Sequence, residues 1–258
     1  LTVEYAENPS WLMVQTLPSV TSTCDDNAMS LATALYVNMT GRMLMHSSPA
    51  IRSVVEQWQR SADKDLVSPL STNSELKEIL LSETPWLNNA ANETRNMQQL
   101  ASFYDSTAIG QRIDAYVQRL QKLQRFDGSF SWWKGMGSSM YATMSVAETL
   151  ARLSTMTTVD RQVGVMVDKA VNYLASGIHK ECERMRKREK RGDTDVRPSE
   201  LALNYLYLCT LNKGSRTFSI SGQKDFDYLI DKLTRINGQL SIYGKARSAI
   251  ILQRAGYK

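Results

Sequence analysis

A chain of 258 residues with 42% hydrophobic and 22% charged residues has the composition of a globular protein with a sizeable core, which excludes an intrinsically disordered chain. Its formal charge of +5 is concentrated between Lys180 and Arg191, so positive and negative charges nearly balance elsewhere. The three cysteines, Cys24, Cys182 and Cys209, are odd in number and widely spaced, which excludes a disulfide framework and a CxxC metal site and predicts at least one free thiol.

The N-terminal segment, Leu1 to Val20, is predicted to be an extended lead-in that ends in a short helical turn. Pro9 and Pro18 lie within it, with apolar and aromatic residues between them, a pattern that suits a strand followed by a turn. From Asp25 to Met39 apolar residues recur every three or four positions, which predicts a helix. Gly41 stands where such a helix is expected to end.

The next part of the chain is also predicted to be helical. Pro49 can begin a helix whose apolar residues run from Ile51 to Trp58. Ser82 to Asn92 is predicted to be a connecting segment. Amphipathic spacing predicts further helices over Thr94–Tyr104 and Ile109–Gln124.

An aromatic turn follows these helices. Asp127-Gly128-Ser129 is a turn signal, and Phe130, Trp132 and Trp133 come directly after it. Large rings at such a turn supply buried area that can lock two helical hairpins together. The alternative is that Trp132 and Trp133 form a platform for a sugar or a peptide.

Five helices are predicted after the turn, the first of them capped by Ser138 or Ser139: Met140–Leu153, Val163–Arg191, Glu200–Leu211, Phe226–Ile236 and Gly244–Ala255. Glu200–Leu211 is apolar on most faces, so it should be buried on several sides. Strands are expected at most near the N-terminus and at Thr217–Ile220. The sequence therefore predicts an all-α fold of helical hairpins that close into a bundle, solenoid or toroid, as one domain over residues 1–258.

The sequence predicts no metal, no cofactor, no nucleic-acid partner and no insertion into a membrane. His46 and His179 lie far apart, in no spacing typical of metal ligands. The basic run Lys180–Arg191 contains acidic residues at helical pairing distances and no aromatic residue, as in a solvated helix tip, with a phosphate-binding stripe as the alternative. No stretch approaches the ~18 consecutive apolar residues that a membrane-spanning helix needs.

Three phrases occur in an order and spacing that resemble a known family. Asn8-Pro9-Ser10-Trp11 and Gln15-Thr16-Leu17-Pro18 lead into Cys24-Asp25-Asp26-Asn27, Ser82-Glu83-Thr84-Pro85-Trp86-Leu87 follows, and Leu123-Gln124 precedes Asp127-Gly128-Ser129-Phe130-Ser131-Trp132-Trp133. The first and last resemble the thioester-containing domain of the alpha-2-macroglobulin and complement family, with its C-x-E-Q motif and its L-Q-x-x-D-G-x-F-x-x-W turn. The middle phrase is similar to a segment of bacterial alpha-2-macroglobulin-like proteins.

The resemblance implies an α/α toroid of the terpenoid cyclase and protein prenyltransferase type, in which an outer ring of helices surrounds an inner ring. It implies a domain of a large secreted or cell-envelope protein that traps endopeptidases. The expected location is extracytoplasmic, and the expected partners are neighbouring domains of the parent protein and target proteases. Since the chain begins without Met, we expect it to be a piece of a longer multidomain protein.

The residues that would carry the thioester depart from the family pattern. The family joins the sulfur of the Cys to the side-chain carbon of the Gln three residues later. Here Cys24 keeps the sulfur, but Asp26 and Asn27 stand at the Glu and Gln positions. Because Asn27 is one methylene shorter, closing the ring would add strain of about one to several kcal/mol. We therefore predict a free Cys24 thiol that is a poor nucleophile, because Asp25 and Asp26 disfavour the thiolate.

The second half of the family's chemistry is also predicted to be missing. Some members use a His to pass the acyl group to hydroxyls, and alignment on the turn puts Tyr141 at that position. A phenol is a weak base at neutral pH. We expect no catalytic residue and a protease trap that acts without a thioester.

Two other functions stay open. Helical toroids also house carbohydrate-active enzymes, which need paired carboxylates facing one cavity, and Asp105, Asp127 and Glu148 are the acids near the aromatic turn. The chain can also be an interaction or structural module of a cell-envelope protein, which uses its rim or an outer face as the binding surface.

Overall fold

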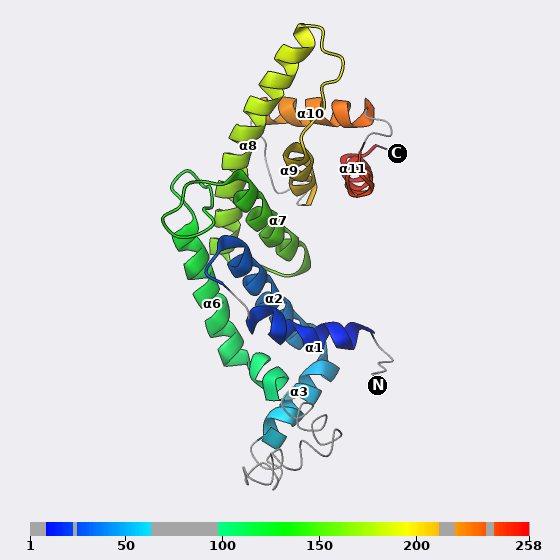
Figure 1. Cartoon of the computed structure of the whole chain (residues 1–258). Coiled ribbons are helices and arrows are strands. Elements are labelled where there is room, and N and C mark those ends of the chain that lie inside the picture. Colours follow the sequence, from blue (N-terminus) through cyan, green and yellow to red (C-terminus); the bar gives the residue numbers. More distant parts are fainter. Residues whose placement is uncertain (1–8, 23–24, 63–97, 212–219, 236–239, 258) are drawn as a thin grey trace, which may run out of the picture. The chain divides into compact units, whose positions relative to one another are not determined.

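A computed structural model describes residues 9–22, 25–62, 98–211, 220–235 and 240–257. In these ranges the regular structure is helical, and β pairing is limited to isolated bridges of Phe130 with Gln124 and with Ser139. For the described residues, the prediction of an all-α fold is confirmed. The helices in chain order are α1 (Pro9–Ser22), α2 (Ala28–Ser47), α3 (Pro49–Ala62), α6 (Ser106–Leu123), α7 (Met140–Met156), α8 (Arg161–Lys190), α9 (Glu200–Leu211), α10 (Ile220–Arg235) and α11 (Ile242–Ala255) (Figure 1).

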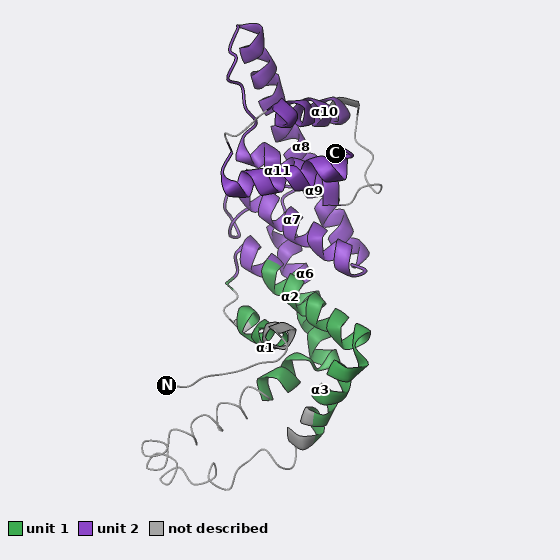
Figure 2. Cartoon of the chain, turned by 90° about the vertical axis from the view of Figure 1, so that its right-hand side faces the viewer, with its two compact units in different colours: residues 1–25, 33–116 green, residues 26–32, 117–258 purple. Residues whose placement is uncertain are grey.

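The chain divides into two compact units (Figure 2). Unit 1 contains residues 1–25 and 33–116, and unit 2 contains residues 26–32 and 117–258. The start of α2 therefore belongs to unit 2, together with the aromatic turn and the helices from α7 to α11. The expectation of a single domain over residues 1–258 stays a prediction. Among the described helices, none is both long and apolar enough to cross a membrane.

The N-terminal lead-in is not extended where the structure describes it, because Pro9–Ser22 forms helix α1. Pro9 suits the first position of a helix, where its fixed φ is favourable and its missing N–H is not needed. Pro18 lies inside α1 and cannot donate to the carbonyl of Val14, four residues earlier. The hydroxyl of Tyr104 donates to that carbonyl at 3.3 Å. A tertiary contact thus replaces the hydrogen bond that Pro18 cannot make.

Helix α2 continues past Gly41 to Ser47, so the prediction that Gly41 ends the helix is wrong. A Cβ at Gly41 would lie 2.9 Å from Cε1 of Phe103 and 3.3 Å from Cδ1 of Ile109. Phe103 belongs to the core of unit 1. The glycine therefore serves a close approach between packed elements and is not a helix cap, a distinction that only tertiary structure reveals.

The helices of unit 2 follow the predicted pattern, except that α10 begins at Ile220, six residues before the predicted start at Phe226. Ser139 caps α7, since its side chain accepts a hydrogen bond from the backbone N–H of Ala142 at 3.2 Å. α7 packs against α8, and α9 packs against both α7 and α11. In α9 every residue from Ala202 to Thr210 except Asn204 is buried, which confirms the prediction of burial on several sides.

Candidate functional site

The described part of the predicted thioester motif is the start of helix α2. Cys24 lies outside the described residues, whereas Asp26 and Asn27 lie in unit 2. Asn27 is the N-cap of α2: its Oδ1 accepts from the backbone N–H of Ser30 at 2.8 Å, and its Nδ2 donates to Oγ of Ser30 at 2.9 Å. Oδ1 of Asn27 therefore caps the helix, and Nδ2 binds the Ser30 side chain.

The motif segment lies against the aromatic turn. The backbone N–H of Ala28 donates to the carbonyl oxygen of Trp132 at 3.0 Å. Asp26 forms an ion pair with Arg119 of α6, and both side chains are substantially exposed. The exposed ion pair with α6 contributes little free energy. The backbone hydrogen bond is the contact that joins the motif segment to the aromatic turn. The structure thus brings together Asp26, Asn27 and the aromatic turn, which the sequence separates by about a hundred residues.

A tight turn places the aromatic residues. Oδ1 of Asp127 accepts from the backbone N–H of Ser129 at 3.0 Å and from its hydroxyl at 2.6 Å. These bonds from Ser129 hold the pKa of Asp127 below its usual range. Gly128 has φ +87°, a left-handed conformation that favours glycine. The chain then enters the core at Phe130, which is fully buried and whose N–H donates to Oγ1 of Thr143 at 2.8 Å.

The half-buried Trp132 and the exposed Trp133 and Tyr141 form a stack that we call the aromatic ladder. The ring of Trp132 lies 6.1 Å from that of Trp133, with 27° between the planes. It lies 5.9 Å from the ring of Tyr141, with 17° between the planes. Trp133 is 48% exposed and Tyr141 is 59% exposed. The aromatic residues of the turn therefore lie in two environments. Phe130 packs into unit 2, whereas Trp133 and Tyr141 of the ladder are exposed to solvent.

The carboxylates considered for catalysis each take part in local hydrogen bonding or ion pairing. Oδ1 of Asp105 caps α6 by accepting from the backbone N–H of Ala108 at 2.7 Å. Asp127 accepts from Ser129, and a lowered pKa is the opposite of what a general acid needs. Glu148 accepts from Arg152 at 2.7 Å and from Arg247 at 2.6 Å.

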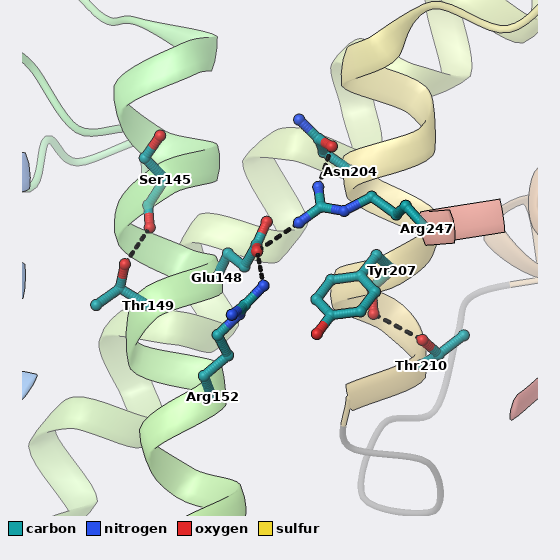
Figure 3. Close-up of polar contacts among 8 residues, drawn as sticks. All are labelled: Ser145, Glu148, Thr149, Arg152, Asn204, Tyr207, Thr210 and Arg247. Carbon is teal, nitrogen blue, oxygen red and sulfur yellow. Dashed lines mark hydrogen bonds and ion pairs between the residues drawn. The ribbon is translucent and has the colours of Figure 1, made fainter. Parts of the chain in front are cut away.

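The contacts of Glu148 form a charged cluster that joins α7, α9 and α11 (Figure 3). Arg247 is only 6% exposed, donates to Glu148 and to Oδ1 of Asn204, and lies with its guanidinium 4.5 Å from the ring centroid of Tyr207. A buried guanidinium needs such a partner, because an unpaired charge in the interior is costly. We assign the cluster to stability, and no local sequence signal predicts it.

A second cluster links α8 to α10 and was also missed from the sequence. Nδ1 of His179 lies 2.6 Å from Oδ2 of the buried Asp225, and Arg186 forms an ion pair with the same carboxylate at 2.8 Å. Cys182, one turn from His179, is fully buried. Burial, with the negative charge of Asp225, raises the pKa of Cys182 to about 12. The thiol stays protonated, so this Cys, His and Asp set holds no nucleophile at neutral pH.

The basic run Lys180–Arg191 forms the charged end of α8, and several of its members pair within unit 2. Glu181 accepts from the backbone N–H and the hydroxyl of Ser199, each at 2.9 Å. Arg188 pairs with Asp193 at 2.6 Å, and Glu189 pairs with Lys232. This pairing favours a solvated helical end that anchors the start of α9 and the side of α10.

In the ranges that the structure describes, no group of three or more His, Cys, Asp and Glu residues has the arrangement of a metal site. Cys182 is a free thiol, so the prediction of at least one free thiol is confirmed. Comparison of the chain with protein-family models, with curated proteins and with solved structures finds no match.

Proposed function

We propose that the chain is a thioester-type domain of an alpha-2-macroglobulin-like endopeptidase inhibitor, folded as an α/α toroid, that acts without a thioester and without enzymatic activity. The order of the sequence phrases supports the family. The hydrogen bond from Ala28 to Trp132 supports the site, because it joins the degenerate motif to the aromatic turn. The parent protein would be extracytoplasmic, with proteases and its own neighbouring domains as partners.

The observation that carries the proposal is the capping role of Asn27. To form a thioester, the Cys24 sulfur would have to attack the side-chain carbon of Asn27 and expel Nδ2 as ammonia. That step would remove Nδ2 together with its bond to Ser30, and it would tie the carbon that carries the capping Oδ1 to the sulfur. The lost cap would cost about 1 kcal/mol, in addition to the strain of the shorter ring. Asn27 therefore suits a helix cap better than an acyl donor.

A non-covalent role fits the exposed aromatic ladder. Trp and Tyr are enriched at the centres of protein interfaces, because they bury large areas at a small cost in side-chain entropy. Tyr141 and Trp133 present such area beside the motif segment. We propose that the ladder contacts a neighbouring domain of the trap.

Of the other functions, an interaction module draws support from the same ladder and differs from the proposal only in the absence of a protease target. The enzyme alternative has less support. Asp105, Asp127 and Glu148 are each engaged by a cap, a turn or an ion pair.

The proposal predicts a characteristic result when the parent protein meets an endopeptidase. A trap encloses the protease and leaves its active site open, so cleavage of a large protein substrate should fall while cleavage of a small chromogenic peptide is retained. The two activities are measured on the same mixture. Denaturing electrophoresis of that mixture should show no protease-linked band, because no acyl bond forms.

Each other outcome contradicts a stated part of the proposal. Equal loss of both activities would indicate an active-site inhibitor. A band that survives denaturation would indicate a working acyl donor. Unchanged cleavage of both substrates by proteases of several specificities would leave the interaction module as the better account.

A further inference from the structure

A basic groove lies between the C-terminal part of α6 and the N-terminal part of α8, entirely within unit 2. Its volume is about 440 Å³, which is within the usual range for sites that hold small molecules or short peptide segments. The lining includes Arg125, Arg161 and Lys169 and no carboxylate. Neither Arg161 nor Lys169 forms an ion pair within the described ranges. Two cations are thus available to a ligand.

The groove has a braced floor. The side-chain amide of Gln124 donates to the carbonyl of Gly128 at 3.1 Å and to that of Met166 at 2.8 Å, which ties the turn to α8. Arg125 donates to the carbonyl of Met136 at 3.2 Å. These bonds link the turn to α8 and to the carbonyl of Met136, and such links reduce the entropic cost of binding.

The groove also presents one amide oxygen and one amide NH2 group, which come from a pair of glutamines. Nε2 of Gln121 donates to Oε1 of Gln162 at 3.0 Å, across from α6 to α8. This bond leaves the side-chain oxygen of Gln121 and the side-chain amide NH2 of Gln162 for other partners. A peptide group carries the matching N–H and carbonyl, so the glutamine pair suits a polypeptide backbone.

An apolar contact completes the groove. Phe126 is 96% exposed and Val165 is 44% exposed, and both belong to the lining. A fully exposed phenyl ring forgoes roughly 1.5 to 3 kcal/mol of burial, which a bulky side chain of a ligand can recover. A bulky apolar side chain of a peptide can cover this ring. A nucleic-acid base can also stack on such a ring, so the test below includes an oligonucleotide.

We infer that this groove binds an acidic peptide segment of a partner protein. Carboxylates of the segment pair with Arg161 and Lys169, its backbone pairs with the glutamine amides, and an apolar side chain covers Phe126. The inference depends on the contacts of the groove and not on the proposed protease trap.

The test measures binding of a fluorescein-labelled hexapeptide of alternating glutamate and phenylalanine by fluorescence anisotropy. We expect a dissociation constant in the micromolar range, raised about tenfold or more by Arg161→Gln/Lys169→Gln and severalfold by Phe126→Ala. The matched control is Lys224→Gln/Lys245→Gln, which removes the same charge from exposed positions of α10 and α11 outside the groove. The control should bind within about twofold of the unaltered chain.

The outcomes are separated by two further ligands, an oligothymidine of equal charge and vesicles of phosphatidylserine with phosphatidylcholine. If the groove variant and the control variant weaken peptide binding equally, net charge explains the binding and the inference is overturned. It would also be overturned if the peptide fails to bind at millimolar concentration, or if only the oligonucleotide or the vesicles depend on Arg161 and Lys169. Unchanged circular dichroism of each variant confirms that these exposed positions alter binding and not folding.

Discussion

Replacement of Gly128 by alanine is expected to destabilise unit 2 by about 3 to 5 kcal/mol. Two causes add. The φ of +87° is strained for any residue with a Cβ, and a Cβ at this position would come within 2.2 Å of the backbone carbonyl oxygen of Lys169 in α8. Backbone cannot move aside as a side-chain end can, so the turn or α8 must shift. Urea unfolding followed by tryptophan fluorescence measures the loss.

Gly135 provides the matched control for the two causes. It has the same φ of +87°, but a Cβ there would meet nothing within 4 Å. Gly135→Ala should therefore cost only the conformational strain, about 1 kcal/mol. Equal losses for the two variants would mean that the contact with Lys169 contributes nothing to the effect of Gly128→Ala.

Replacement of Glu148 by glutamine is expected to destabilise unit 2 by about 3 kcal/mol. The variant keeps the size of the side chain but removes the negative charge that balances Arg152 and Arg247. Arg247 is almost fully buried, so water cannot compensate for the missing partner. Thermal and urea unfolding measure the change, and a lowered midpoint with unchanged circular dichroism is the expected result.

Two further variants show whether the burial of Arg247 causes the loss of stability in Glu148→Gln. Asp231→Asn breaks the exposed pair with Arg235 on α10 and should cost less than about 0.5 kcal/mol. The double variant Glu148→Gln/Arg247→Met removes both charges of the buried pair and should lose less stability than the sum of its single changes. Additive losses in the double variant would contradict a coupled ion pair.

The helices of unit 2 could be predicted from the sequence because their signals are local. Ser139 precedes an apolar pattern and caps α7, and α9 has the predicted bounds of Glu200 and Leu211. α1 and Gly41 were mispredicted because tertiary contacts decide them. Tyr104 accommodates Pro18 inside a helix, and Phe103 explains a glycine that resembles a cap in sequence.

The candidate site was predictable only in part. The motif and the turn could be recognised from the sequence. The hydrogen bond between Ala28 and Trp132 could not be predicted, because these residues lie about a hundred positions apart. The cap at Asn27 has a local signal in the sequence, an asparagine directly before an apolar helix. Asp225 reaches His179 from another helix, and no local pattern indicates such a contact.

The central claim is that Asn27 caps a helix and that Cys24 is a free thiol. The intact mass of the chain, measured with and without methylamine and after alkylation in denaturant, tests it most directly. We predict the full sequence mass, no change with methylamine, and one iodoacetamide adduct on each of the three cysteines. A mass short by one ammonia, a gain of one methylamine and only two alkylated cysteines, all abolished by Cys24→Ser, would contradict the account.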